Sequence, residues 1–301
     1  MTEILDSLLG GNTTTPESST PNTEGGLNIE GQDNTPNALA GTNNNDNITG
    51  GNAPDTIAGG GGNDNISGGD AGDALVGNGG NDTVDGGSGD DSMRGGRGAD
   101  LLLGGTGNDI LFGDNDDDSI NSGLGNDNTN GNRGNDFNSG GAGNDRSDGG
   151  KNDDTLDGGS GDDILIGSRG NDSLIGGTGA DSFAFYTSAD GSYGIDTLTD
   201  FNSAEGDKIL LGASAAVPQD ARFNAITNAG VTNGVLPDSL FGAIGVDFTD
   251  LAAADTSGAA IIYDPSNGFV YYNPDNAGGD LRQFAVLENN ASLAASDFEI
   301  F

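Results

Sequence analysis

The sequence predicts an all-β protein in which short parallel strands stack on one another in a long series of turns. The first observation is a strict period, since an aspartate occurs every nine residues between 41 and 184, at all 16 positions. The second is that an apolar residue follows 13 of these aspartates by two places, and glycine precedes 15 of them by five. The third is composition, because 57 glycines and a hydrophobic share of 32% cannot fill an ordinary globular core.

The repeated aspartates share the environment Gly-Gly-x-Gly-x-Asp-x-U-x, in which U is a large apolar residue. The six residues rich in glycine and asparagine predict a tight turn, because glycine tolerates positive φ. The remaining three residues predict a three-residue strand whose middle side chain points inward. Such a strand is unstable alone, so the turns must stack. A disordered acidic segment would not keep one nine-residue phase from residue 41 to residue 184.

The acidic residues of the repeats suit a hard cation. All 26 carboxylates between residues 41 and 184 belong to Asp and none to Glu, as expected for a short side chain reaching from a tight turn. Aspartate supplies a charged oxygen and the glycine-rich backbone supplies carbonyl oxygens, a ligand set that favours Ca²⁺ over Mg²⁺. Only six basic residues balance these carboxylates, so we expect the repeats to be unfolded without calcium.

The rest of the composition excludes several function classes. The chain has no Cys and no His, which removes disulfides, histidine-activated nucleophiles and most zinc sites. A formal net charge of −39 argues against binding to nucleic acid or to anionic membranes. No apolar stretch approaches the ~20 residues of a membrane helix, and residues 1–10 lack the pattern of a cleaved signal peptide. We expect no enzymatic activity.

Residues 86–112, GGSGDDSMRGGRGADLLLGGTGNDILF, resemble the RTX (repeats-in-toxin) haemolysin-type calcium-binding family. The resemblance implies a right-handed parallel β-roll in which two repeats make one turn and Ca²⁺ lies between the loops of successive turns. For 16 repeats it implies eight coils, with up to about 14 calcium ions between them. It also implies export through type I secretion machinery, and an extracellular or cell-surface location in a Gram-negative-type bacterium.

The resemblance assigns the calcium ligands to the repeated aspartates and to the loop glycines of the best-formed repeats. The aspartates are Asp64, Asp73, Asp82, Asp91, Asp100, Asp109, Asp118, Asp127, Asp136, Asp145, Asp154, Asp163, Asp172, Asp181 and Asp196. The glycines are Gly86, Gly87, Gly89, Gly95, Gly96, Gly98, Gly104, Gly105, Gly107, Gly158, Gly159, Gly161, Gly176, Gly177 and Gly179.

Some repeats depart from the pattern where glycine is expected to have positive φ. The second position departs at Thr42, Asn78, Asp114, Asn132 and Ser168, and the fourth at Asn44, Ala53, Ala71, Asp116 and Asn152. A residue other than glycine costs about 1 kcal/mol in that conformation. We therefore expect weaker sites at residues 41–58 and 113–121.

Two further irregularities concern the inward and outward positions. Thr129, Asn138 and Ser147 are polar where an apolar residue is expected, which predicts either a soft joint or a ladder bonding to a neighbouring chain. Several outward positions are apolar, and such patches usually mark a covered surface. These are Leu101, Leu103, Ile110 and Phe112, which either the leader or a second chain would cover, and Ile164, Ile166 and Ile175, which the C-terminal region would cover.

The chain divides into a flexible leader at residues 1–40, the repeats at 41–184 and a β-rich cap at 185–301. DTLTDF…GDKILL (196–211) resembles the C-terminal cap of serralysin-type secreted proteins, after a degenerate repeat at residues 191–199. Residues 260–275 predict a β-hairpin with its turn at 264–268. The ending SDFEIF resembles an uncleaved type I secretion signal.

Two functions follow as hypotheses. The first is a secreted calcium-binding structural protein of the cell surface or extracellular matrix. The alternative is an accessory export and folding module, related to RTX proteases, lipases or toxins but without a catalytic domain of its own. The expected partners are calcium and the secretion machinery, together with a second copy of the chain or a cell-surface polysaccharide or S-layer.

Overall fold

The computed structural model describes residues 18–23, 25–186, 194–212, 241–243, 261–272, 281–289 and 291–300. The chain forms two compact units, Met1–Lys151 and Asn152–Phe301, called here the N-terminal and C-terminal units. Within the described ranges the secondary structure is almost entirely β-strand, with one 3₁₀ turn at Ala295–Asp297. No helix in this part of the chain is long and apolar enough to cross a membrane.

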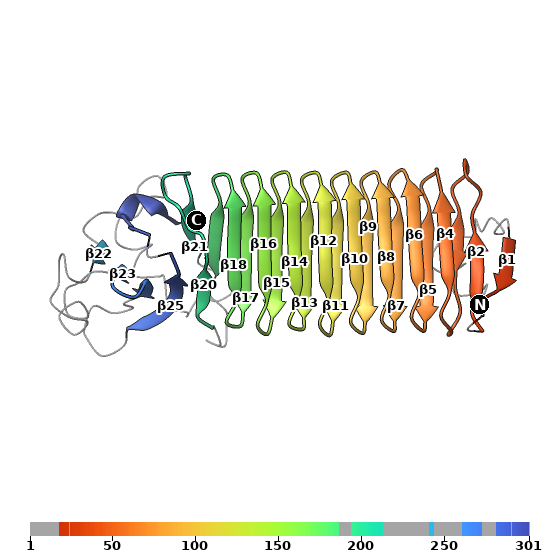
Figure 1. The fold of residues 1–301 in the computed structure, drawn as a ribbon, viewed down its shortest axis with the longest axis horizontal. Helices are drawn as coiled ribbons and strands as arrows, with labels where there is room; N and C mark the ends of the chain where they lie inside the picture. The colour runs from red at the N-terminus through yellow and green to blue at the C-terminus, as the bar shows by residue number, and fades with distance from the viewer. Residues whose placement is uncertain are drawn as a thin grey trace. The chain divides into compact units, whose positions relative to one another are not determined.

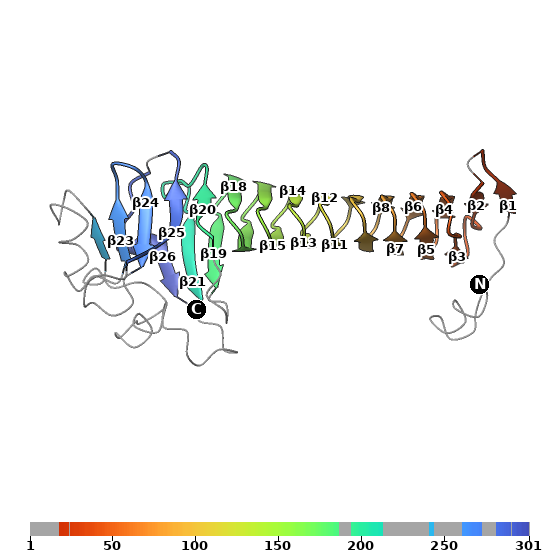
Figure 2. The same ribbon diagram turned by 90° about the horizontal axis from the view of Figure 1, so that it is seen from below.

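The N-terminal unit consists of two sheets between which successive strands alternate (Figure 1). Sheet A contains β1 (Ser18–Pro21), β2 (Leu27–Glu30), β4 (Asn47–Gly51), β6 (Asn65–Asp70), β8 (Thr83–Ser88), β10 (Leu101–Thr106), β12 (Ser119–Leu124) and β14 (Phe137–Ala142). Sheet B contains β3 (Ala38–Ala40), β5 (Thr56–Gly61), β7 (Ala74–Gly79), β9 (Ser92–Arg97), β11 (Ile110–Asn115), β13 (Asn128–Arg133) and β15 (Arg146–Lys151). Figure 2 shows the two sheets as separate layers.

Each repeat strand pairs in parallel with the strand one full turn away. Leu102 in β10 lies opposite Val84 in β8 on one side and Ile120 in β12 on the other. The two partners are each 18 residues distant, so two nonapeptides make one turn. The predicted fold class, an all-β parallel solenoid built from this repeat, is confirmed.

The repeat strands are longer than the three residues that the sequence pattern predicts, so that expectation is wrong. Strand β6 covers six residues, Asn65–Asp70, and runs through the apolar residue and both following glycines. Pairing continues there because Gly69 lies opposite Gly87 and Asp70 lies opposite Ser88. The turn is correspondingly short and contains only residues 71–73 between β6 and β7.

The core of the N-terminal unit is a column of apolar side chains between the two sheets. The members are at most 3% exposed and are Ile29, Leu39, Ile48, Ile57, Ile66, Leu75, Val84, Met93, Leu102, Leu111 and Ile120. Ile29 and Leu39 belong to the segment that the sequence assigns to the leader. Their strands nevertheless pair in parallel with β4 and β5, because the two side chains extend the same apolar column.

The apolar column of the N-terminal unit ends at Ile120, and buried polar side chains follow it. Thr129 Oγ1 donates a hydrogen bond to Ser147 Oγ at 3.0 Å, and Asn138 Nδ2 donates to the carbonyl of Asp148 at 3.2 Å. All three polar side chains are at most 1% exposed. Because they are buried and bonded within the unit, they do not form a ladder to a neighbouring chain.

The C-terminal unit begins with four repeat strands and continues into an aromatic core. Its first sheet has the order β16 (Thr155–Ser160), β18 (Ser173–Thr178), β20 (Asp196–Leu198), β25 (Arg282–Leu287), β24 (Phe269–Tyr272), β23 (Ile261–Asp264) and β22 (Phe241–Ala243). Its second has the order β17 (Ile164–Arg169), β19 (Ser182–Tyr186), β21 (Lys208–Gly212) and β26 (Phe298–Ile300). The buried cluster includes Phe183, Phe201, Tyr263, Phe284 and Phe298.

Several sequence expectations concern the C-terminal unit. The predicted hairpin is confirmed, since β23 and β24 pair antiparallel and Gly268 in the turn has φ of 77°. Ile166, an outward position expected to be covered, is 1% exposed. Half of the terminal SDFEIF segment, Phe298–Ile300, forms β26, which pairs with β21, and Phe298 is fully buried. Residues 191–193 and Phe301 lie outside the described residues.

The structure of the column predicts that mutations in its apolar and polar layers affect the stability of the protein differently. In saturating calcium, Leu102→Ala should lower the free energy of unfolding by about 2–5 kcal/mol, because it leaves a cavity in the closed column. The paired change Thr129→Val/Ser147→Ala removes both partners of one buried hydrogen bond and should be nearly neutral or stabilising. Chemical denaturation of both variants measures this, and a large loss for the paired change would contradict the interpretation.

Candidate metal centre

The repeated aspartates form two ladders in the N-terminal unit. In each ladder the carboxylate Oδ1 accepts a hydrogen bond from the backbone N–H of the aspartate one turn earlier. Asp82 thus accepts from Asp64 at 2.7 Å and Asp100 accepts from Asp82 at 2.8 Å. In the other ladder Asp91 accepts from Asp73 at 2.7 Å. The ladder holds each carboxylate in one orientation at the turn.

The second carboxylate oxygen lies in a different environment. Eight aspartates have an Oδ2 that is buried and receives no hydrogen bond from the described residues: Asp55, Asp64, Asp73, Asp82, Asp91, Asp100, Asp109 and Asp118. Their side chains are 1–4% exposed. A buried charged oxygen without a partner is costly unless a cation or a donor compensates it. The recurrence of the same deficit turn after turn indicates a repeated ligand site.

First-position glycines leave the space into which these oxygens point. A Cβ added to Gly86 would lie 2.3 Å from Asp91 Oδ2 and 2.7 Å from the carbonyl oxygen of Gly104 in the next turn. Any side chain would therefore displace the carboxylate and the carbonyl that approach each other there. A Cβ added to Gly95, Gly104, Gly158 or Gly176 would likewise lie 2.3–2.6 Å from the Oδ2 of the aspartate in the same repeat.

Glycines at the second and fourth positions all have positive φ. Gly87 has φ of 100° and Gly89 has φ of 124°. The same holds for Gly96, Gly98, Gly105, Gly107, Gly159, Gly161, Gly177 and Gly179. A Cβ on Gly87 would lie 2.2 Å from the carbonyl oxygen of Gly69 in the preceding turn. A side chain at this position would therefore clash with the backbone of the preceding turn.

Seven of the ten departures from glycine adopt positive φ, as the sequence predicts. They are Ala71, Asn78, Asp114, Asp116, Asn132, Asn152 and Ser168, with φ between 71° and 84°. Thr42, Asn44 and Ala53 do not have positive φ, so no strain arises at these three positions. Asp114 in β11 and Asp116 in the turn that follows belong to one repeat, which supports the expectation of a weaker site at residues 113–121.

The electrostatics of the ladders disfavour carboxylates that lack a counter-charge. Burial raises the pKa of Asp64 and Asp100 to about 7 and that of Asp118 to about 8. The hydrogen bond from the preceding aspartate N–H lowers each pKa, and carboxylates in neighbouring turns raise it again. The pKa values of Asp73, Asp91, Asp109, Asp136, Asp145 and Asp181 are raised to about 6, with burial as the largest cause. A nearby cation would reverse this effect, because opposite charge favours the ionised form.

The donor set fits calcium. Within the described ranges, no cluster of three or more Asp, Glu, His or Cys side chains is placed to hold a metal ion. A site at these loops would therefore combine one or two carboxylates with backbone carbonyls. Oxygen-only ligation with a large carbonyl share is typical of Ca²⁺, whereas Zn²⁺ prefers nitrogen and sulfur ligands.

Two ladder positions extend the set expected from the sequence. Asp55 is 3% exposed and has an Oδ2 without a partner, although it was not among the expected ligands. In the C-terminal unit, Asp172 N–H donates to Asp196 Oδ1 at 3.2 Å and Asp181 N–H donates to Asp207 Oδ1 at 3.0 Å. The strict period included Asp55, and the fragment Gly206-Asp207 signalled the other position.

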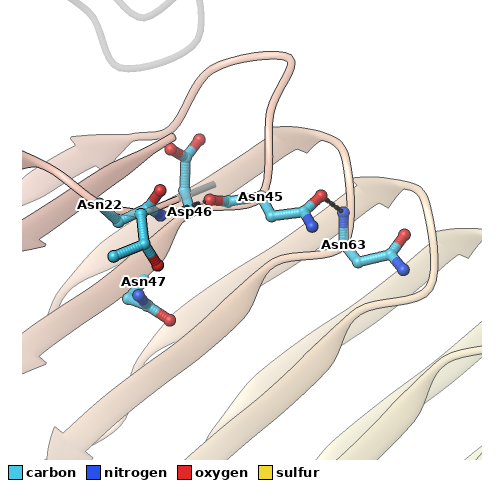
Figure 3. A pocket seen from close by; sticks show the side chains of 6 residues that line it. Asn22, Asn45, Asp46, Asn47 and Asn63 are labelled. Carbon is cyan, nitrogen blue, oxygen red and sulfur yellow. Dashed lines mark hydrogen bonds between the residues drawn. The ribbon is translucent and has the colours of Figure 1, made fainter. Parts of the chain in front are cut away.

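A second ladder on the outside of the loops was missed by the sequence analysis. It uses the residue before each aspartate, and it runs in the opposite direction. Asn45 Oδ1 accepts from Asn63 N–H at 2.7 Å (Figure 3). Asn63 Oδ1 in turn accepts from Asn81 N–H at 2.9 Å. The signal was present, because Asn or Asp occupies this position in 12 of the 16 repeats.

In the first turn, hydrogen-bond donors of the protein satisfy the carboxylate that begins one aspartate ladder, Asp46. A polar cavity of about 160 Å³ lies there, lined by Asn22, Thr23, Asn45, Asp46, Asn47 and Asn63 (Figure 3). Asp46 Oδ1 accepts from Leu27 N–H, and Asp46 Oδ2 accepts from the N–H and the hydroxyl of Thr42. Both oxygens of this first carboxylate are satisfied, so we assign no cation site to Asp46.

Comparison with known proteins identifies one similarity. The model of the RTX calcium-binding nonapeptide repeat matches residues 40–75, 67–102, 94–129, 103–137, 130–156, 139–174 and 157–184. Together these matches cover residues 40–184 without a gap. A comparison with curated proteins finds no match.

The raised pKa values predict a pH dependence of folding without calcium. A carboxyl with a raised folded-state pKa stabilises the fold fully below its unfolded pKa, near 4, and loses that contribution as pH rises through the folded value. In EDTA, β-structure measured by circular dichroism should therefore decline as pH rises from about 6 to about 8. Asp100→Asn/Asp118→Asn should weaken this dependence, whereas the outward pair Asp70→Asn/Asp85→Asn should preserve it. An equal response of the two variants would refute the assignment.

Proposed function

Because residues 40–184 belong to the family of RTX calcium-binding nonapeptide repeats, we propose that this protein is a secreted calcium-binding structural protein that folds when calcium binds. The observation that carries the proposal is the series of buried Oδ2 atoms without a hydrogen-bond partner. Each one needs a cation or a proton before the turn is stable at neutral pH. Calcium supplies that charge when bound, and the chain supplies the oxygens.

The proposed ligands are the ladder aspartates and the loop carbonyls near the glycines. We retain the aspartates from Asp64 to Asp181 and Asp196 as proposed ligands, and we add Asp55 and Asp207 because both take part in the ladders. We expect up to about 14 ions, with affinities of ~0.1–1 mM as in extracellular modules. Because the repeats carry 26 aspartates and six basic residues, binding free energy becomes folding free energy.

The proposed setting is the outside of a bacterial cell. Low calcium in the cytosol would keep the chain unfolded for a type I secretion channel, and calcium outside would fold it at the cell surface or in the extracellular matrix. RTX calcium-binding repeats are typical of secreted bacterial proteins, and their presence in this chain supports this location. A surface polysaccharide or S-layer is a proposed partner, and we assign the chain no enzymatic activity of its own.

Calcium titration tests the folding proposal. The β-sheet signal in circular dichroism should appear cooperatively with calcium at pH 7.5, remain absent in EDTA, and respond far less to magnesium. Asp100→Asn removes a charged ladder oxygen and should raise the calcium midpoint about three- to tenfold. Asp70→Asn removes the same charge from an exposed strand position and should leave the midpoint nearly unchanged. A folded, protease-resistant wild-type chain in excess EDTA at this pH would exclude calcium-dependent folding.

Deletion of residues 296–301 tests the export proposal. The truncated chain should remain inside the cell, because the proposed signal is lost. The deletion also removes Phe298 from the buried core, so Ile209→Ala serves as the control. Ile209 lies opposite Phe298, and its truncation damages the same packing while leaving the tail intact. Normal secretion of the truncated chain, or retention of both variants, would contradict a signal in the tail.

A further inference from the structure

The strands of the two sheets in the N-terminal unit carry opposite formal charges. Every charged residue in the strands of sheet A is acidic: Glu30, Asp70 and Asp85. The strands of sheet B contain five basic residues, Arg94, Arg97, Arg133, Arg146 and Lys151, against Asp114 and Asp148. The formal charge is therefore −3 on sheet A and +3 on sheet B. In a chain of net charge −39, a basic face of this kind is a distinct feature.

Three basic residues of sheet B form a row at the last position of their strands, β9, β13 and β15. Arg97 and Arg133 both lie opposite Asn115 in β11, one strand to either side, and Lys151 occupies the same repeat position in β15. Arg97, Arg133 and Lys151 are exposed. Only Arg94, among the basic residues of this unit, forms a described ion pair, at 2.6 Å to Asp114. The row therefore presents positive charge along the sheet.

Sheet A presents exposed apolar side chains where sheet B is basic. Leu101, Leu124 and Phe137 are 37%, 56% and 44% exposed, and they lie on the three neighbouring strands β10, β12 and β14. Leu101 and Phe137 share one row, with Ser119 between them. Sheet B carries an apolar residue as well, because Ile110 in β11 is 42% exposed. Flat apolar surface of this kind usually marks an interaction site.

We propose that sheet A of one molecule packs against sheet B of a second copy of this chain. The inference rests on the proposed function, because the two faces exist only once calcium has folded the repeats. Acidic strands would meet basic strands, and Leu101, Leu124 and Phe137 would meet the face that carries Ile110. The contact joins two different surfaces, so each molecule keeps one free face of each kind. Such a heterologous contact adds further copies and does not stop at a dimer.

The available area is sufficient for a stable contact. Six-residue strands are about 20 Å long. Seven parallel strands, β2 to β14, extend about 34 Å along sheet A. One face thus offers about 700 Å² and a pair of faces about 1,400 Å², which lies within the range of specific protein interfaces, about 1,200–2,000 Å². Flat sheets also pack face to face readily, at about 10 Å separation.

Charge distinguishes a second copy joined through unlike faces from the other possible partners of these sheets. If sheet A packed against sheet A, acidic strands would face acidic strands, and if sheet B packed against sheet B, basic rows would face basic rows. Contacts between like faces are therefore disfavoured. An acidic polysaccharide would match the row of sheet B but would leave the apolar side chains of sheet A in water. A second copy, joined through unlike faces, matches both features.

Sedimentation velocity in saturating calcium tests the proposal on the full chain. The average mass should rise continuously with protein concentration and fall with salt. The variant Arg133→Glu/Lys151→Glu reverses sheet B and should sediment as a monomer, as should Asp70→Lys/Asp85→Lys on sheet A. An equimolar mixture of the two variants should associate again, because each reversed face meets its complement. Arg133→Glu alone should weaken association at least several-fold more than the equally charged control Arg282→Glu in β25.

Circular dichroism of each sample separates the possible failures. A wild-type chain that calcium folds but that remains a monomer at every concentration overturns the stacking while leaving calcium-dependent folding intact. A chain that calcium does not fold overturns both. Variant mixtures that stay monomeric exclude the pairing of unlike faces. If polygalacturonate binds the folded monomer and Arg133→Glu/Lys151→Glu abolishes that binding, the basic row serves an acidic polymer instead.

Discussion

A carboxylate confined in a tight turn is the constraint on which this structure depends. A typical ladder aspartate, such as Asp100, offers one oxygen to the backbone of the preceding turn and keeps the other buried, beside a glycine that has no side chain to compete for the space. That arrangement orients the turn and sets the spacing of the sheets. It also concentrates negative charge along both sides of the roll, so the stability of the fold becomes a function of what neutralises that charge.

Most of the fold could be predicted from the nine-residue period, because position within the repeat determines whether a side chain points inward. Strand length could not, since glycine-rich segments predict turns and only pairing between neighbouring turns extends the strands through Gly69 and its equivalents. The early start of the roll was hidden for a similar reason. Ile29 and Leu39 continue the apolar column, but Ile29 lies opposite Ile48 at a spacing of 19 residues, which breaks the period.

The candidate site shows the same division. The acidic positions follow from the period alone, and positive φ at Asn78 or Ser168 follows from the repeat position that each occupies. The outer ladder through Asn45 and Asn63 was indicated only by the frequency of Asn and Asp at that position, and an amide there equally suits a solvated turn. The hydrogen bond from Thr129 to Ser147 also depends on a facing strand that the sequence does not specify. Long-range partners, rather than residue types, are what the pattern leaves open.

The spacing of 18 residues between ladder partners also limits how such a gene can change length. Loss or duplication of two nonapeptides removes or adds one whole turn, and every remaining aspartate still meets a partner one turn away. Loss of a single nonapeptide moves all later repeats to the opposite sheet. The rows of Arg133 and Lys151 would then lie on the face that otherwise carries Asp70 and Asp85. Recombination within the array is therefore conservative in steps of two repeats and disruptive in steps of one.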